Sequence, residues 1–77
     1  MKIDVQLLLT FEQAIGQGRN PYTLELAPGS TVADLVSSLP IPQNAPKVVL
    51  VNGRLPRDEQ VLKEGDRLTV FPPLEGG

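Results

Sequence analysis

The run Lys47-Val48-Val49-Leu50-Val51 constrains the fold more than any other stretch of this chain. Four consecutive apolar residues form a strand-length segment without a polar face, the pattern of a strand buried on both sides at the centre of a sheet. Asn52-Gly53 follows and predicts a tight turn that ends the strand. We therefore expect one domain whose sheet is built around residues 47–51, because 77 residues enclose a single core.

Alternation of apolar and polar residues predicts the other strands. The first strand has its apolar residues at Ile3, Val5, Leu7 and Leu9, and the second has them at Tyr22, Leu24 and Leu26. Turn-forming residues between positions 13 and 21 predict that these two strands are antiparallel. Residues 60–62 are a candidate for a short edge strand, and Arg67–Phe71 is the final strand.

One helix is expected between the second strand and the apolar run. Thr31 and Asp34 have the spacing of a capping box, and an apolar stripe follows at positions 32, 35, 36 and 39. The prolines in the segment Pro40–Pro46 prevent the helix from continuing. The predicted fold class is therefore α+β, with a mixed sheet of four to five strands wrapped around one helix.

The amino-acid composition excludes several kinds of catalytic and metal-binding site. The chain has no cysteine and no histidine, so thiolate metal sites, a cysteine nucleophile and the usual neutral-pH general base are all absent. We therefore expect a protein that is not an enzyme by itself, and we expect no metal site. A net charge of −2 without a basic stripe argues against nucleic acid as a partner, and no apolar run is long enough to cross a bilayer. We expect a cytoplasmic protein that binds no membrane.

The sequence ends on Phe71-Pro72-Pro73-Leu74-Glu75-Gly76-Gly77. Two adjacent prolines favour an extended path, and a terminal glycine without a Cβ can enter a narrow enzyme channel and present its carboxylate for activation. The alternative is a frayed tail without a function. Leu8 is similarly ambiguous, because it lies out of phase in its strand and is either an ordinary exposed apolar residue or part of a docking patch.

Three segments resemble the ubiquitin-like β-grasp sulfur carriers, the family of the molybdopterin synthase small subunit (MoaD) and the thiamin-pathway carrier ThiS. These segments are residues 49–53, 62–68 and 70–77, and the similarity extends over the whole chain. The Phe-Pro-Pro-x-x-Gly-Gly ending is closer to MoaD than to ThiS. The resemblance implies a β-grasp domain over residues 1–71 and a flexible C-terminal tail over residues 72–77.

The resemblance also implies a chemistry and partners. An E1-like adenylyltransferase (MoeB- or ThiF-like) would use ATP and Mg²⁺ to adenylate the Gly77 carboxylate, and a persulfide would then convert it to a thiocarboxylate that donates sulfur. No cofactor would bind to this chain itself. The acceptor would be the large subunit of molybdopterin synthase (MoaE-like), in biosynthesis of the molybdenum or tungsten cofactor, or another sulfur-acceptor enzyme. Leu8, Leu55 and Phe71 match the family's apolar partner-facing positions.

One segment departs from the MoaD pattern. MoaD proteins carry extra helical sequence where this chain has the short, proline-rich segment Pro40–Pro46. The sequence therefore does not identify the enzyme that accepts the sulfur. A ThiS-like carrier for the thiamin thiazole is one alternative, a ubiquitin-like modifier that is joined to lysines of other proteins is a second, and an interaction domain with an inert tail is a third.

Overall fold

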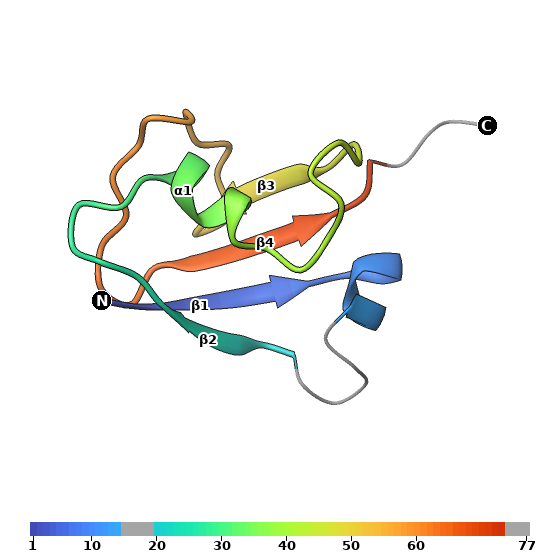
Figure 1. Cartoon of the computed structure of the whole chain (residues 1–77), viewed down its shortest axis with the longest axis horizontal. Coiled ribbons are helices and arrows are strands. Elements are labelled where there is room, and N and C mark those ends of the chain that lie inside the picture. Colours follow the sequence, from blue (N-terminus) through green and yellow to red (C-terminus); the bar gives the residue numbers. More distant parts are fainter. Residues whose placement is uncertain (15–19, 74–77) are drawn as a thin grey trace.

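The structure is a computed structural model that describes residues 1–14 and 20–73 (Figure 1). Its elements are β1 (Lys2–Leu7), the 3-10 helix η1 (Leu9–Ala14), β2 (Tyr22–Glu25), α1 (Val32–Ser37), β3 (Val48–Val51) and β4 (Arg67–Phe71). The described strands form one sheet in the order β2-β1-β4-β3, in which β1 and β4 are parallel and the two outer pairs are antiparallel. The expected α+β fold, with a mixed sheet and one helix, is confirmed.

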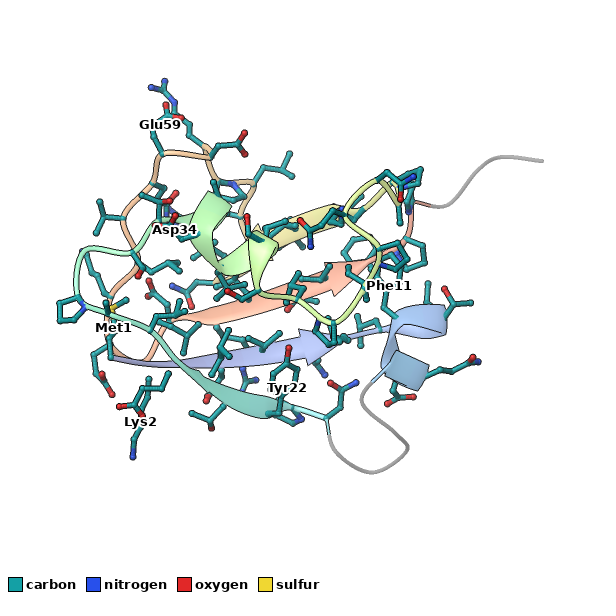
Figure 2. The ribbon with its side chains drawn as sticks, in the orientation of Figure 1. Met1, Lys2, Phe11, Tyr22, Asp34 and Glu59 are labelled. Atoms are coloured by element: carbon teal, nitrogen blue, oxygen red, sulfur yellow. The ribbon has the colours of Figure 1, made fainter. Side chains whose placement is uncertain are left out.

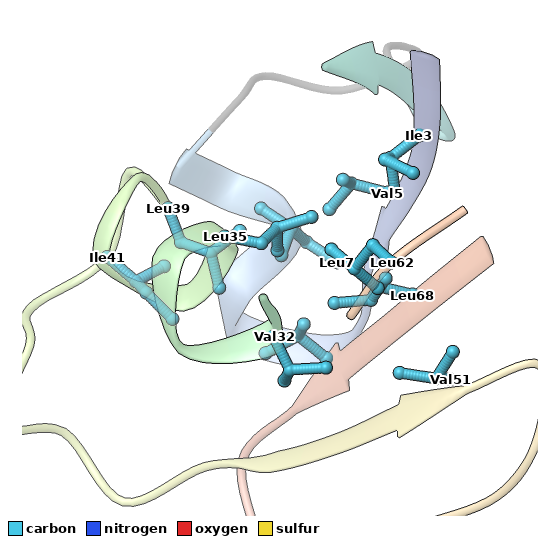
Figure 3. Packing of buried hydrophobic residues seen from close by; sticks show 11 residues of the cluster. Ile3, Val5, Leu7, Val32, Leu35, Leu39, Ile41, Val51, Leu62 and Leu68 are labelled. Carbon is cyan, nitrogen blue, oxygen red and sulfur yellow. The ribbon is translucent and has the colours of Figure 1, made fainter. Parts of the chain in front are cut away.

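The core lies between α1 and one face of the sheet (Figure 3). Ile3, Val5 and Leu7 of β1 are fully buried, as the alternation predicted, and the register sets Val5 beside Leu68 and Leu7 beside Val70. The remaining core residues are Val32, Leu35, Leu39, Ile41, Val51 and Leu62. Because both central strands bury alternate residues, their intervening residues point to the opposite face of the sheet.

The prediction that residues 47–51 form the central strand is wrong. β3 lies at the edge of the sheet and pairs only with β4 (Figure 1). Val51 is buried and Val49 packs against the core, whereas Val48 and Leu50 alternate with them and are only half-buried. The outer face of this strand is thus apolar although no other element covers it. An apolar run in the sequence cannot distinguish such an edge strand from a strand enclosed on both faces.

The prediction that Leu9 continues the first strand is also wrong. The Leu8 amide still donates to the Val70 carbonyl at 2.9 Å, but Leu9 adopts a left-handed backbone (φ 58°) and its side chain is 58% exposed. The chain turns there into η1, which brings Phe11 against the core.

Residues 60–62 form no strand of the sheet. Val61 makes an isolated bridge to Thr31, and the Leu62 amide donates to the Ser30 carbonyl at 2.9 Å. The segment therefore pairs with the residues that lead into α1. Leu62 is buried, while Val61 is 53% exposed.

Local signals at the helix and at the turn are confirmed. The Asp34 amide donates to Thr31 Oγ1 and the Thr31 amide donates to Asp34 Oδ2, which completes the capping box. Asn52 and Gly53 both have positive φ, 51° and 85°, as a type I′ turn requires. Helix α1 itself ends at Ser37, before the last residue of the predicted apolar stripe.

Candidate functional site

The face of the sheet opposite α1 changes from charged to apolar along its length. At the end where β1 begins, Asp4 lies beside Arg67, and their side chains form an ion pair of 3.7 Å that is about half exposed. Gln6 lies beside Thr69 in the middle. At the far end, where β4 leads toward the tail, the residues of this face are apolar.

Four half-buried apolar residues make up this end, and we call them the tail-base patch: Leu8, Val48, Leu50 and Phe71. Phe71 is the last residue of β4 and lies opposite Val48, while Leu50 lies opposite Thr69. Leu8 directly follows the Leu7–Val70 pair and is held to β4 by its amide. The strand pattern therefore directs all four side chains to the outer face, at the base of the segment that continues into the tail.

The tail-base patch contains two of the three residues that sequence analysis assigned to partner binding. Leu7 and Val70 are buried and lie side by side in paired strands. Leu8 and Phe71 are the residues that follow them, so both lie on the opposite face of the sheet. Sequence analysis missed Val48 and Leu50 because it assigned the whole run to a buried strand. Their alternation with Val49 and Val51 is invisible when all four residues are apolar, so no signal in the sequence could have separated the two pairs.

Leu55 lies elsewhere. It is 79% exposed and forms part of the wall of a groove of about 450 Å³ together with residues of α1 and of β3 such as Val36 and Val49. The Val49 side chain is on the helix side of the sheet, opposite the tail-base patch. The structure therefore brings Leu8 and Phe71 together and sets Leu55 in the groove beside α1.

Asn20 fixes the end of β1 at the point where the tail-base patch begins. The Leu7 amide donates to Asn20 Oδ1 at 2.9 Å, and Asn20 Nδ2 donates to the Leu7 carbonyl and to Glu12 Oε2. The side-chain amide thus replaces the neighbouring strand that the backbone of Leu7 would otherwise need. Figure 2 labels Tyr22, the first residue of β2, which lies two positions after Asn20 in the chain.

The tail itself is described only at its start. Pro72 and Pro73 are half-buried and directly follow Phe71. Leu74, Glu75, Gly76 and Gly77 lie outside the described residues, so the structure does not test their predicted role.

Burial raises the pKa of the Tyr22 phenol above its ordinary value of about 10, so ionisation of this phenol requires a higher pH than that of an exposed tyrosine. Within residues 1–14 and 20–73, no three carboxylate side chains gather as a metal ion would require. In the same ranges, the only α-helix has six residues, so none of the described helices could reach across a bilayer.

Comparison with known proteins identifies the family. The ThiS family model matches residues 12–77, which includes the Gly76-Gly77 ending. No curated protein matches the sequence. Among solved structures, the protein from Pyrococcus furiosus described as "Putative molybdopterin converting factor, subunit 1" is 27% identical, with a TM-score of 0.81 over 96% of this chain and 99% of that one.

Two further solved structures share the fold at lower identity. Small archaeal modifier protein 1 from Haloferax volcanii is 19% identical, with a TM-score of 0.78 over 95% of this chain and 98% of that one. A ubiquitin from Caldiarchaeum subterraneum is 23% identical, with a TM-score of 0.68 over 100% of this chain and 98% of that one. These two likenesses establish the ubiquitin-like β-grasp fold alone.

The family assignment gives the general role. MoaD- and ThiS-like proteins are small carriers rather than enzymes, and they generally act with E1-like activators and sulfur-accepting partners. The resemblance of the sequence to the MoaD and ThiS family is confirmed. With 66 of its 77 residues matched by the family model (positions 12 through 77), the chain belongs to the ThiS family of ubiquitin-like sulfur carriers.

Proposed function

We propose that this protein carries sulfur as a C-terminal thiocarboxylate on Gly77. The observation that carries the proposal is that the family match continues through residue 77 and so includes the Gly76-Gly77 ending. A carboxylate is a poor electrophile until it is joined to a good leaving group, whereas a thiocarboxylate is a nucleophile that can transfer its sulfur. The chain supplies the carboxylate, and partner enzymes supply the chemistry.

The proposed activation has three steps. A Gly77 carboxylate oxygen attacks the α-phosphorus of ATP, bound with Mg²⁺ by an E1-like adenylyltransferase, and pyrophosphate leaves. A persulfide sulfur on a partner then attacks the carbonyl carbon and AMP leaves, giving an acyl disulfide. A thiol of the partner attacks the other sulfur, which forms a protein disulfide and releases the thiocarboxylate. The absence of cysteine from the carrier suits this sequence, because a carrier thiol could attack its own activated terminus.

The tail-base patch supports docking of the tail into partner enzymes. Leu8, Val48, Leu50 and Phe71 surround the point from which the chain continues to the tail. A few apolar anchors carry most of the binding energy of a typical interface. A partner that covers this patch would therefore hold the tail at its own active site, and the same surface could serve the activator and the acceptor in turn.

We propose that the acceptor acts in molybdopterin biosynthesis, as the large subunit of a molybdopterin synthase. The likeness to the Pyrococcus furiosus protein and the Phe-Pro-Pro-x-x-Gly-Gly ending of the sequence favour this assignment. Thiazole synthesis in the thiamin pathway is the alternative within the family. A synthase assay for each acceptor, supplied with thiocarboxylated carrier, decides between them: sulfur transfer only to a thiazole synthase would contradict the molybdopterin assignment.

The test of the carrier proposal is the intact mass of the protein after incubation with ATP, Mg²⁺, an E1-like adenylyltransferase and a persulfide donor. We expect replacement of one oxygen by sulfur in the full chain and no change in a variant that lacks Gly77. Conjugates of higher mass that depend on Gly77 would instead indicate a protein modifier, the role named for the similar Haloferax volcanii protein. If neither the thiocarboxylate nor conjugates form, both the carrier and the modifier assignments are contradicted.

Docking is tested with charge substitutions in the tail-base patch. Leu8→Glu and Phe71→Glu are each expected to weaken adenylyltransferase binding about tenfold or more, because a hot-spot anchor is replaced by a charge. Val61→Glu is the matched control, because Val61 is 53% exposed and belongs to the segment that pairs with the residues before α1. Amide spectra establish that each variant is folded. Unchanged affinity of both patch variants would contradict this docking surface.

Leu55→Glu separates the two locations of the predicted partner-binding residues. Leu55 lies in the groove beside α1 and is not in the tail-base patch. If Leu55→Glu lost as much affinity for the adenylyltransferase as Phe71→Glu does, the surface that binds the adenylyltransferase would include both the tail-base patch and the groove beside α1. We expect a smaller loss.

A further inference from the structure

The groove beside α1 has the form of a site for an extended peptide. Its apolar wall is made by Val32 and Val36 of α1, Val49 of β3, and Leu55 with Pro56 of the loop that follows. Its volume of about 450 Å³ is enough for one large aliphatic side chain with its flanking backbone. It lies on the helix side of the sheet, so it is separate from the tail-base patch.

The two ends of this groove carry opposite charges. The Ala33 amide donates to the Asp58 carbonyl at 3.1 Å, which places Asp58 at the end where α1 begins. Gln43 Nε2 donates to the Val36 carbonyl, and Lys47 Nζ donates to the Gln43 carbonyl, both at 3.2 Å, which places Lys47 at the other end. A neutral carbonyl is a weaker partner for an ammonium group than a carboxylate is. The groove therefore favours a ligand with one defined direction.

One side of the groove is the outer edge of β3, which Arg54 occupies at Val51 and which is open at Val49. The Val51 amide donates outward to the Arg54 carbonyl, whereas the Asn52 amide donates to Arg67 of the last strand. Backbone groups alternate sides along an antiparallel strand, so the N–H and C=O of Val49 face outward, away from β4. Among the described residues, these two groups of Val49 have no hydrogen-bond partner. Figure 1 shows β3 as the outermost strand on this side.

We propose that this groove binds an extended segment of a partner protein that adds to β3 as an antiparallel strand. One residue of the segment, aliphatic, exchanges both backbone hydrogen bonds with Val49 and places its side chain between α1 and β3. The residue two positions later lies opposite Lys47 on the same face and is acidic. The residue two positions earlier is basic and lies toward Asp58, away from β3, because Arg54 already occupies the edge of β3 at Val51. This inference does not rest on the sulfur-carrier proposal.

The probe is the synthetic peptide acetyl-Gly-Lys-Thr-Ile-Thr-Glu-Gly-amide, which has this pattern. Its matched control is acetyl-Gly-Glu-Thr-Ile-Thr-Lys-Gly-amide, which has the same composition and the opposite charge order. Each is titrated into the full chain while amide and methyl spectra are recorded. We expect saturable shifts at Val49 and Val36, with the first peptide bound roughly fivefold to tenfold more tightly, because two exposed ion pairs each contribute modestly.

The decisive variant is the double charge reversal Lys47→Glu with Asp58→Lys, which should exchange the preference between the two peptides. Both side chains are on the groove's rim, so the fold is expected to tolerate the change. Leu55→Ser should weaken both peptides severalfold, whereas Val61→Ser, outside the groove, should weaken neither.

Four results would overturn the proposal. The first is the absence of saturable shifts with either peptide, and the second is equal binding of the two peptides by the wild-type chain and by the double variant. The third is a set of shifts at Val49 that depends on protein concentration without peptide, because the occupant would then be a second copy of this chain. Shifts centred on Leu8 and Phe71 would assign the peptide to the tail-base patch and would also contradict it.

Discussion

Removing the side-chain amide of Asn20 tests how the end of β1 is held. Leu7 is fully buried, and its N–H and C=O are both paired with Asn20. In Asn20→Ala these two backbone groups lose their partners. An unpaired buried group costs about 1–3 kcal/mol, and since the site is only partly buried, water recovers part of that; we expect a total loss of about 2 kcal/mol.

That loss is large for a domain of this size. The free energy of unfolding of 77 residues is of the order of 4–12 kcal/mol, from about 0.05–0.15 kcal/mol per residue. A loss of about 2 kcal/mol should lower the melting temperature by roughly 8–16 °C. The measurement is urea unfolding at constant m-value, together with hydrogen exchange of the Leu7 amide.

In the variant Asn20→Asp, the stability of the fold should depend on pH. The introduced carboxylate can still accept from the Leu7 amide but cannot donate to its carbonyl, and it lies beside the Glu12 carboxylate. The like charge raises the pKa of the introduced group above its ordinary value of about 4, so its protonated form stabilises the fold at low pH. The variant should lose stability as the pH rises through that raised pKa toward 7.

The control for both variants is Gln43→Ala. Gln43 also donates from its side chain to a backbone carbonyl, that of Val36, but the bond is exposed and the expected loss is below about 0.5 kcal/mol. Unchanged exchange of the Leu7 amide in Asn20→Ala, with an unfolding midpoint equal to that of the control, would refute the reasoning.

Three shorter predictions concern local structure. Gly53→Val should cost about 1–2 kcal/mol of unfolding free energy, because Gly53 has a φ of 85° that a β-branched residue adopts poorly; an unchanged urea midpoint would contradict this. Thr31→Val keeps the side-chain shape but removes the acceptor for the Asp34 amide, and should cost about 0.5–2 kcal/mol by the same assay. Tyr22 is the single tyrosine, so its absorbance titration is unambiguous: burial raises its pKa above about 10, and stability should be retained below pH 10 and fall as the pH rises through the raised value. A midpoint at or below 10 would contradict the last prediction.

The sequence determined the elements whose signals are local. Alternation located β1 and β2, the Thr31 and Asp34 pair located the start of α1, and Asn52-Gly53 located the turn. These signals are reliable because each depends on residues that are near neighbours in the chain: side-chain periodicity, a reciprocal cap and the backbone freedom of two turn residues. The family motif over the final residues likewise needed no coordinates.

The tertiary structure decided the order of the strands and therefore the surfaces. An apolar run fits equally a strand enclosed on both faces and an edge strand whose outer face is kept apolar, and only the pairing of β1 with β4 selects the second for residues 48–51. This strand order leaves Val48 and Leu50 half-buried on the outer face beside Phe71. It also leaves the backbone edge of Val49 open to the groove beside α1. Strand pairing depends on contacts between residues far apart in the chain, which no local pattern contains.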